Sequence, residues 1–154
     1  MTVVGNEFDT HLSLQMENSI FIPGNTPSSK NSKVWTGKFL VSSKTTRDYA
    51  KNHSDDYWIN KVKFKKIFSG IPTPYFVGMY FVRDSKRRFD YINICQVVAD
   101  LMVMNGLIED DSADFFVPVF LGYKVDKQHP GVYLQRVDSI ITSDPTPKPV
   151  LGLS

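Results

Sequence analysis

The chain has 154 residues, which suits one domain, and its 42% hydrophobic and 22% charged content is ordinary for a globular protein with a buried core. Its formal net charge of +2 is too small to indicate nucleic-acid binding by itself. A single cysteine, Cys95, excludes an intramolecular disulfide and a cysteine-rich zinc site. Because the sequence has no long apolar run and no secretory signal, we expect no membrane span and a cytoplasmic location.

The N-terminal part predicts two short β elements joined by a polar loop. Residues 1–18 read as a flexible leader. A short strand is expected at 19–24, where Pro and Gly end it. The loop at 25–33 is rich in small polar residues, and 34–43 reads as a short hairpin or strand.

A long helical segment follows, from Thr45 to about Phe68. We expect two pieces that break near Asn52–His53, with Ser54 as the N-cap of the second piece. The apolar residues that we expect to face the core are Trp58, Ile59, Val62 and Ile67.

The second half predicts a strand, a regular helix and two further strands, at 74–83, 91–105, 115–126 and 131–137. Gly106 stands where a helix commonly ends, and Pro118 indicates an edge strand or a bulge. The expected fold class is α+β, with a small mixed β-sheet and two main helices packed on it. The domain spans 19–140, and a Pro-rich extended tail occupies 141–154.

Acidic side chains flank the 91–105 helix and are the candidates for chemistry. Asp90 precedes the helix, and Asp110 and Asp111 follow it; Asn93 lies in its first turn. Carboxylate and amide oxygens are ligands that Mg²⁺ prefers. A different interpretation makes Asp90 only an N-cap and the acids after the helix a solvated loop.

Basic residues adjoin these acids. Lys86, Arg87 and Arg88 directly precede Asp90, and arginines beside a metal site would hold phosphate in a bidentate manner. Lysines of the N-terminal loop and hairpin would neutralise further DNA phosphates. Solvated, purely solubilising roles explain both groups as well. These lysines are Lys30, Lys33 and Lys38.

The run RRFDYIN at 87–93, followed by an amphipathic helix, N-G and then D-D, resembles the signature of the RusA family of Holliday-junction resolvases. On this resemblance the family's first aspartate falls on Asp90, its asparagine on Asn93, its glycine on Gly106 and its D-D pair on Asp110 and Asp111. The P-S-S-K-N-S loop after the first strand is similar as well. The resemblance covers roughly residues 19 to 137.

The resemblance implies a RusA-like homodimer that cleaves four-way or other branched DNA in recombination and repair. It implies Mg²⁺, or Mn²⁺ as a substitute, at Asp90, Asp110, Asp111 and Asn93, with catalysis by the three aspartates. Members of the family are often encoded by phages or prophages.

One departure from the family stands inside the motif. The family's second aspartate falls on Ile92, and a family lysine falls on Gln96. Three explanations stay open: another oxygen ligand, such as Asn93 or Asp110, replaces the aspartate; the metal keeps an additional water; or the protein binds junctions with weak or no cleavage. The last possibility is the alternative function: a branched-DNA binding protein of the same fold.

A straight helix over 91–105 separates its ends by roughly 20 Å. Asp90 and Asp111 of one subunit would then share a metal only if the chain after Gly106 folds far back. Antiparallel packing of two such helices in a homodimer offers a second route, with a site shared between subunits.

Overall fold

The computed structural model describes residues 16–28, 33–35 and 40–138. The predicted leader lies outside the described residues up to residue 15, and the predicted tail lies outside them entirely. In chain order the elements are η1 (Met16–Asn18), β1 (Ser19–Pro23), β2 (Lys33–Trp35), β3 (Leu40–Ser42), α2 (Lys44–Ile59), α3 (Lys61–Ile67), β4 (Tyr75–Arg83), α4 (Tyr91–Met104), β5 (Phe116–Val125) and β6 (Gly131–Arg136).

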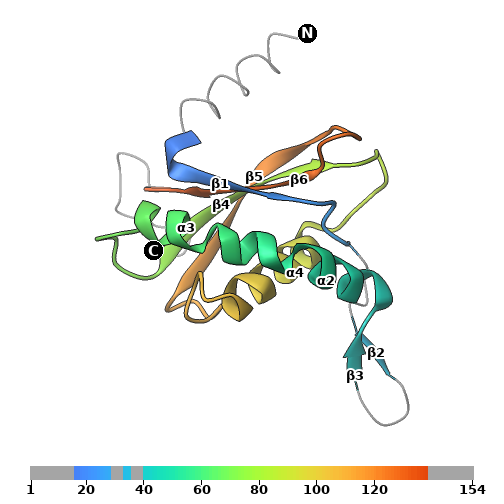
Figure 1. The fold of residues 1–154 in the computed structure, drawn as a ribbon, viewed down its shortest axis with the longest axis horizontal. Coiled ribbons are helices and arrows are strands. Elements are labelled where there is room, and N and C mark those ends of the chain that lie inside the picture. Colours follow the sequence, from blue (N-terminus) through green and yellow to red (C-terminus); the bar gives the residue numbers. More distant parts are fainter. Residues whose placement is uncertain (1–15, 29–32, 36–39, 139–154) are drawn as a thin grey trace, which may run out of the picture.

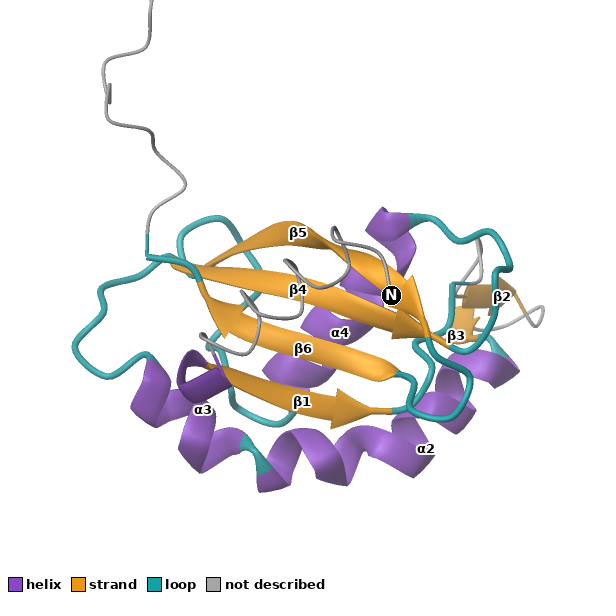
Figure 2. Ribbon diagram, turned by 90° about the horizontal axis from the view of Figure 1, so that it is seen from above, coloured by secondary structure: helices purple, strands orange, loops and turns teal. Residues whose placement is uncertain are grey.

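Four strands form one mixed sheet in the order β1-β6-β4-β5. Strands β4 and β5 are parallel, whereas β6 is antiparallel to both β4 and β1. Helices α2, α3 and α4 cover one face of this sheet (Figures 1 and 2). The expected α+β class with a small mixed sheet is therefore confirmed, with three helices rather than two. Pro118 does lie on an edge strand, β5.

The β2–β3 hairpin is a separate two-stranded unit that projects from the body beside the start of α2 (Figure 1). Strand β4 is central and almost continuously buried, as its apolar sequence predicts. Within the described residues, no helix has the length and apolarity needed to cross a membrane.

The helical segment differs from the sequence-based expectation at its start and at its break. Ser43 caps α2 by accepting a hydrogen bond from the Thr46 backbone N–H. The break falls at Asn60 rather than near 52–53, and Ser54 lies inside α2, where its hydroxyl accepts from Asn105. Most of the predicted core residues are wrong too: Trp58, Ile59 and Val62 are exposed, and only Ile67 is buried.

The chain turns back along α4 after Gly106. Gly106 has φ +77°, a left-handed conformation that favours glycine at a helix C-terminus. The Leu107 N–H donates to the Met102 carbonyl, and Leu107 and Ile108 are buried in the core. Two apolar side chains directly after the glycine therefore hold the returning segment against the helix.

Candidate functional site

The exposed side of α4 carries a row of polar residues. The core-facing side of this helix is buried, from Ile94 to Met102. Position 92, Gln96 and Asp100 are exposed and follow one another at four-residue spacing, so they lie above one another on one face. This exposed face is the part of α4 that the candidate residues after the helix could reach.

Asp90 occupies the N-cap position of α4, but its side chain forms no capping hydrogen bond. Its carboxylate Oδ2 instead accepts from Asn93 Nδ2 at 3.4 Å, and the residue is exposed. Asp90 is thus the N-cap residue by position, but its carboxylate does not pair with a backbone N–H of the helix. The structure brings the Asp90 and Asn93 side chains together.

Asp111 is returned to the middle of α4 by the turn at Gly106. Gln96 Nε2 donates to Asp111 Oδ2 at 3.3 Å and to Asp100 Oδ1 at 2.7 Å. Because both bonds start from the same nitrogen, Asp100 Oδ1 and Asp111 Oδ2 are separated by no more than the sum of these two distances. Asp100 is thus a site residue that the sequence analysis did not select, although its four-residue spacing from Gln96 was a usable signal.

Asp110, in contrast, is exposed, and among the described residues no hydrogen bond joins its side chain to Asp100, Gln96 or Asn93. Its roles in catalysis and metal binding stay predictions, and no hydrogen bond to these residues supports them.

The turn also changes the argument for a site shared between subunits. Because Asp111 contacts Gln96, it lies near a helix position only six residues after Asp90, roughly 9 Å along the axis instead of the full helix length. One subunit therefore brings Asp111 back to the half of the helix that Asp90 precedes. Within the described ranges, no group of three or more His, Cys, Asp or Glu side chains is close enough to hold a metal ion.

Ile92 stands at the gap in this acidic face. Its side chain is 77% exposed, and with Gln96 and Asp111 it lines a pocket of about 230 Å³. An aspartate at this position would therefore face Asp111. Cys95 lines the same pocket, and burial raises the pKa of its thiol.

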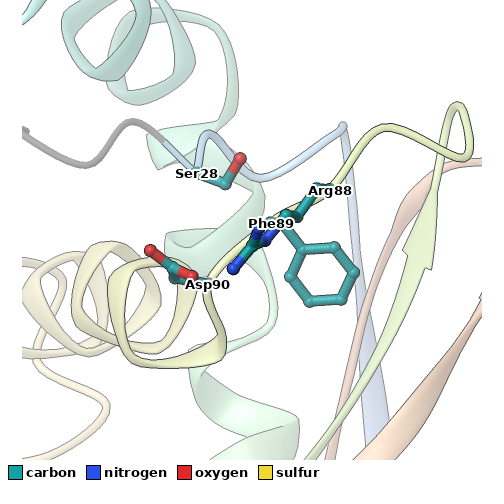
Figure 3. Close-up of a pocket in the computed structure, with 4 residues that line it drawn as sticks. All are labelled: Ser28, Arg88, Phe89 and Asp90. Carbon is teal, nitrogen blue, oxygen red and sulfur yellow. The ribbon is translucent and has the colours of Figure 1, made fainter.

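The start of α4 adjoins a second, basic region. Ser28, Arg88, Phe89 and Asp90 line a pocket of about 320 Å³ (Figure 3). Figure 3 shows that Ser28 comes from the loop after β1, whereas the other three residues precede α4. A phosphate bound by Arg88 would consequently lie directly beside the Asp90 carboxylate.

Only some of the other residues that the sequence predicts to contact DNA lie within the described part of the structure. Lys86 and Arg87 are exposed on the loop before α4. Lys33 begins β2, but its side chain is not described, and Lys30 and Lys38 lie outside the described residues.

Mg²⁺ is commonly held by one or two protein carboxylates together with water and substrate phosphates. Asp100 and Asp111 supply two carboxylates around one amide, whereas Asp90 stands at the N-cap of the helix and forms no three-acid group with them. The donor chemistry of this face therefore fits a sparsely ligated, water-rich Mg²⁺ ion.

Comparison with family models and with curated proteins gives no match to this chain. The RusA resemblance consequently rests on the motif residues alone.

Proposed function

We propose that this protein is a metal-dependent endonuclease of the RusA type, which resolves four-way DNA junctions by paired phosphodiester hydrolysis. One observation carries the proposal. Asp111 is folded back onto Gln96 in the N-terminal half of α4, and Asp90, directly before this helix, lines a pocket together with Arg88. Cleavage of a phosphodiester needs acids and cations close together, and this region supplies both.

Asp100 and Asp111, which Gln96 links, are the residues that would hold the metal, together with water and a substrate phosphate. Asp90, which the resemblance adds as a ligand, precedes the same helix. When bound, Mg²⁺ or Mn²⁺ supplies a polarised water and charge stabilisation for the leaving oxygen. Arg88, and beside it Arg87, bind and orient the scissile phosphate through charge-assisted hydrogen bonds. Gln96 positions the Asp100 and Asp111 side chains by donating to both.

The proposal includes a homodimer, because two cuts placed symmetrically on a four-way junction need two sites related by a two-fold axis. Each subunit carries its own Asp100 and Asp111 next to Gln96, so neither site has to take these two acids from its partner.

The alternative is a branched-DNA binding protein with weak or no cleavage. The observation that favours it is Ile92, which the resemblance aligns with a family aspartate and whose exposed apolar side chain lines the same pocket as Asp111. In that case the arginines bind the junction, and the acids that remain do not hold a metal tightly enough for turnover.

Binding and cleavage should be measured on the same labelled four-way junction, with binding in EDTA and cleavage in Mg²⁺ or Mn²⁺. The variant is Asp111→Asn. Asp114→Asn is its matched control, because Asp114 is an exposed acid of the same loop and lies outside the pair of hydrogen bonds from Gln96.

The endonuclease proposal predicts that wild type and Asp114→Asn cleave the junction, whereas Asp111→Asn binds it equally well and cleaves it at least about 100-fold more slowly. Cleavage that survives in Asp111→Asn would remove Asp111 from the proposal. Tight binding without cleavage by the wild type would establish the alternative.

A further inference from the structure

A second pocket, of about 380 Å³, lies next to the one in Figure 3, where the loop after β1 meets the segment after β4. Hydrogen bonds fix its two walls to each other. Arg83 Nη1 donates to the Thr26 carbonyl, and the Asp84 backbone N–H donates to Asn25 Oδ1 at 3.0 Å. The volume lies in the range of pockets that bind small ligands.

Arg83 is the unusual residue of this pocket. It ends the central strand, is only 6% exposed, and places its guanidinium 4.7 Å from the centre of the Phe89 ring. Within the described part of the chain, the Thr26 carbonyl is the one hydrogen-bond acceptor of this side chain, and Arg83 itself lines the pocket. An anion that enters the pocket would therefore offset part of the cost of burying this cation.

The charge of the residues that line the pocket indicates how much negative charge its ligand should carry. Arg83, Arg87 and Arg88 line it together with one acid, Asp84, which leaves an excess of positive charge. A phosphomonoester carries about −1.5 to −2 charge near pH 7, whereas a phosphodiester carries one negative charge. The monoester therefore matches this lining better.

The burial of Arg83 also favours a phosphomonoester over an internal phosphodiester. An internal phosphodiester of a duplex is part of a continuous backbone, so it cannot reach the Arg83 side chain, which is only 6% exposed. The end of a strand, or a free nucleotide, can enter a recess of this size.

We propose that this pocket binds the phosphomonoester of a nucleotide, at a strand terminus or in a free nucleotide. Arg83 forms its floor, and Arg87 and Arg88 close around the phosphate. The inference goes beyond the proposed function, because it requires neither a metal nor cleavage.

The test is fluorescence anisotropy in EDTA with short single-stranded oligonucleotides that differ only in a terminal phosphate or hydroxyl, at the 5′ end or the 3′ end. Arg87→Gln is the variant, because Arg87 is exposed and its loss should not affect folding. Lys86→Gln is the matched control: it removes the same charge from the same loop, and Lys86 does not line the pocket.

The wild type should bind one phosphorylated strand about tenfold or more tightly than its hydroxyl counterpart. Arg87→Gln should lose most of that preference, whereas Lys86→Gln should weaken both strands equally and keep it. Equal affinity of the wild type for phosphate and hydroxyl ends would overturn the proposal, as would an unchanged preference in Arg87→Gln.

Competition separates the two sources of the phosphate. Displacement by a nucleoside 5′-monophosphate at concentrations near those of the oligonucleotide supports a site for free nucleotides. A preference that the mononucleotide cannot displace supports a site for strand ends. Because metal is absent throughout, failure here leaves the cleavage assay of the proposed function unaffected.

Discussion

Replacement of Ile92 by aspartate should strengthen metal binding at the acidic face of α4. Ile92 is 77% exposed in the first turn of the helix, so its loss removes little buried apolar surface. An acid in the first turn also interacts favourably with the helix dipole, by about 0.3–1 kcal/mol. Ile92→Asp should therefore fold at least as stably as the wild type in the absence of metal.

The expected gain follows from the pocket that Ile92 shares with Asp111 and Gln96. If the new carboxylate tightens metal binding about tenfold, near-saturating metal adds about 1.4 kcal/mol to the stability of the folded state. For a chain of this length, that is an additional increase in melting temperature of about 3–6 °C. Cleavage of the four-way junction should increase as well.

The assay is thermal denaturation with and without Mn²⁺ or Mg²⁺, repeated with Ile92→Asn as the matched control. The asparagine removes the same isoleucine and adds a polar side chain of nearly the same shape without the charge. An equal response of Ile92→Asp and Ile92→Asn to the metal would refute the reasoning, because position 92 would then not contribute a ligand.

Three further predictions concern the fold around the site. Gly106→Ala places a Cβ at φ +77° and 2.9 Å from Lys61 Nζ, so urea titration should show a loss of about 1–3 kcal/mol; unchanged stability would contradict the left-handed turn. Tyr57→Phe removes the 2.9 Å hydrogen bond to Tyr49 and should lower stability by about 1 kcal/mol near pH 7. Because burial raises the pKa of Tyr57, the folded state keeps a proton that the unfolded state loses above about pH 10. Wild-type stability therefore falls as pH rises past that value, and the deficit of Tyr57→Phe should shrink there; an equal deficit near pH 7 and near pH 11 would count against it. Burial also raises the pKa of the Cys95 thiol, so iodoacetamide should alkylate the native protein far more slowly than the urea-unfolded protein, and equal rates would show an accessible thiol.

Elements with a strong local signal could be predicted from the sequence. The uninterrupted apolar run of β4 indicated a strand buried on both faces, and Gly106 marked the end of α4. The helical segment was harder, because two apolar phases compete in it. The buried phase contains Tyr49, Tyr57 and Phe64, whereas Trp58 and Ile59, adjacent to it in sequence, are exposed. Which of the two phases is buried depends on how the helices are oriented against the sheet. Sequence periodicity does not contain that information.

The site illustrates the same limit. The motif identified Asp90 and Asp111 as candidates, but not how Asp111 reaches α4. That depends on Leu107 and Ile108, which are buried and hold the returning chain against the helix. The contact of Gln96 with both Asp100 and Asp111 follows from this packing, so it required the structure.

The central claim is tested most directly by mapping the cuts that the wild-type protein makes in Mg²⁺ or Mn²⁺ on a four-way junction, with each strand labelled in turn and a matching linear duplex as control. The account predicts paired nicks at symmetric positions on two opposing strands of the junction, and far weaker cutting of the duplex. Tight binding of the junction without nicks in either metal would contradict the endonuclease and leave a junction-binding protein.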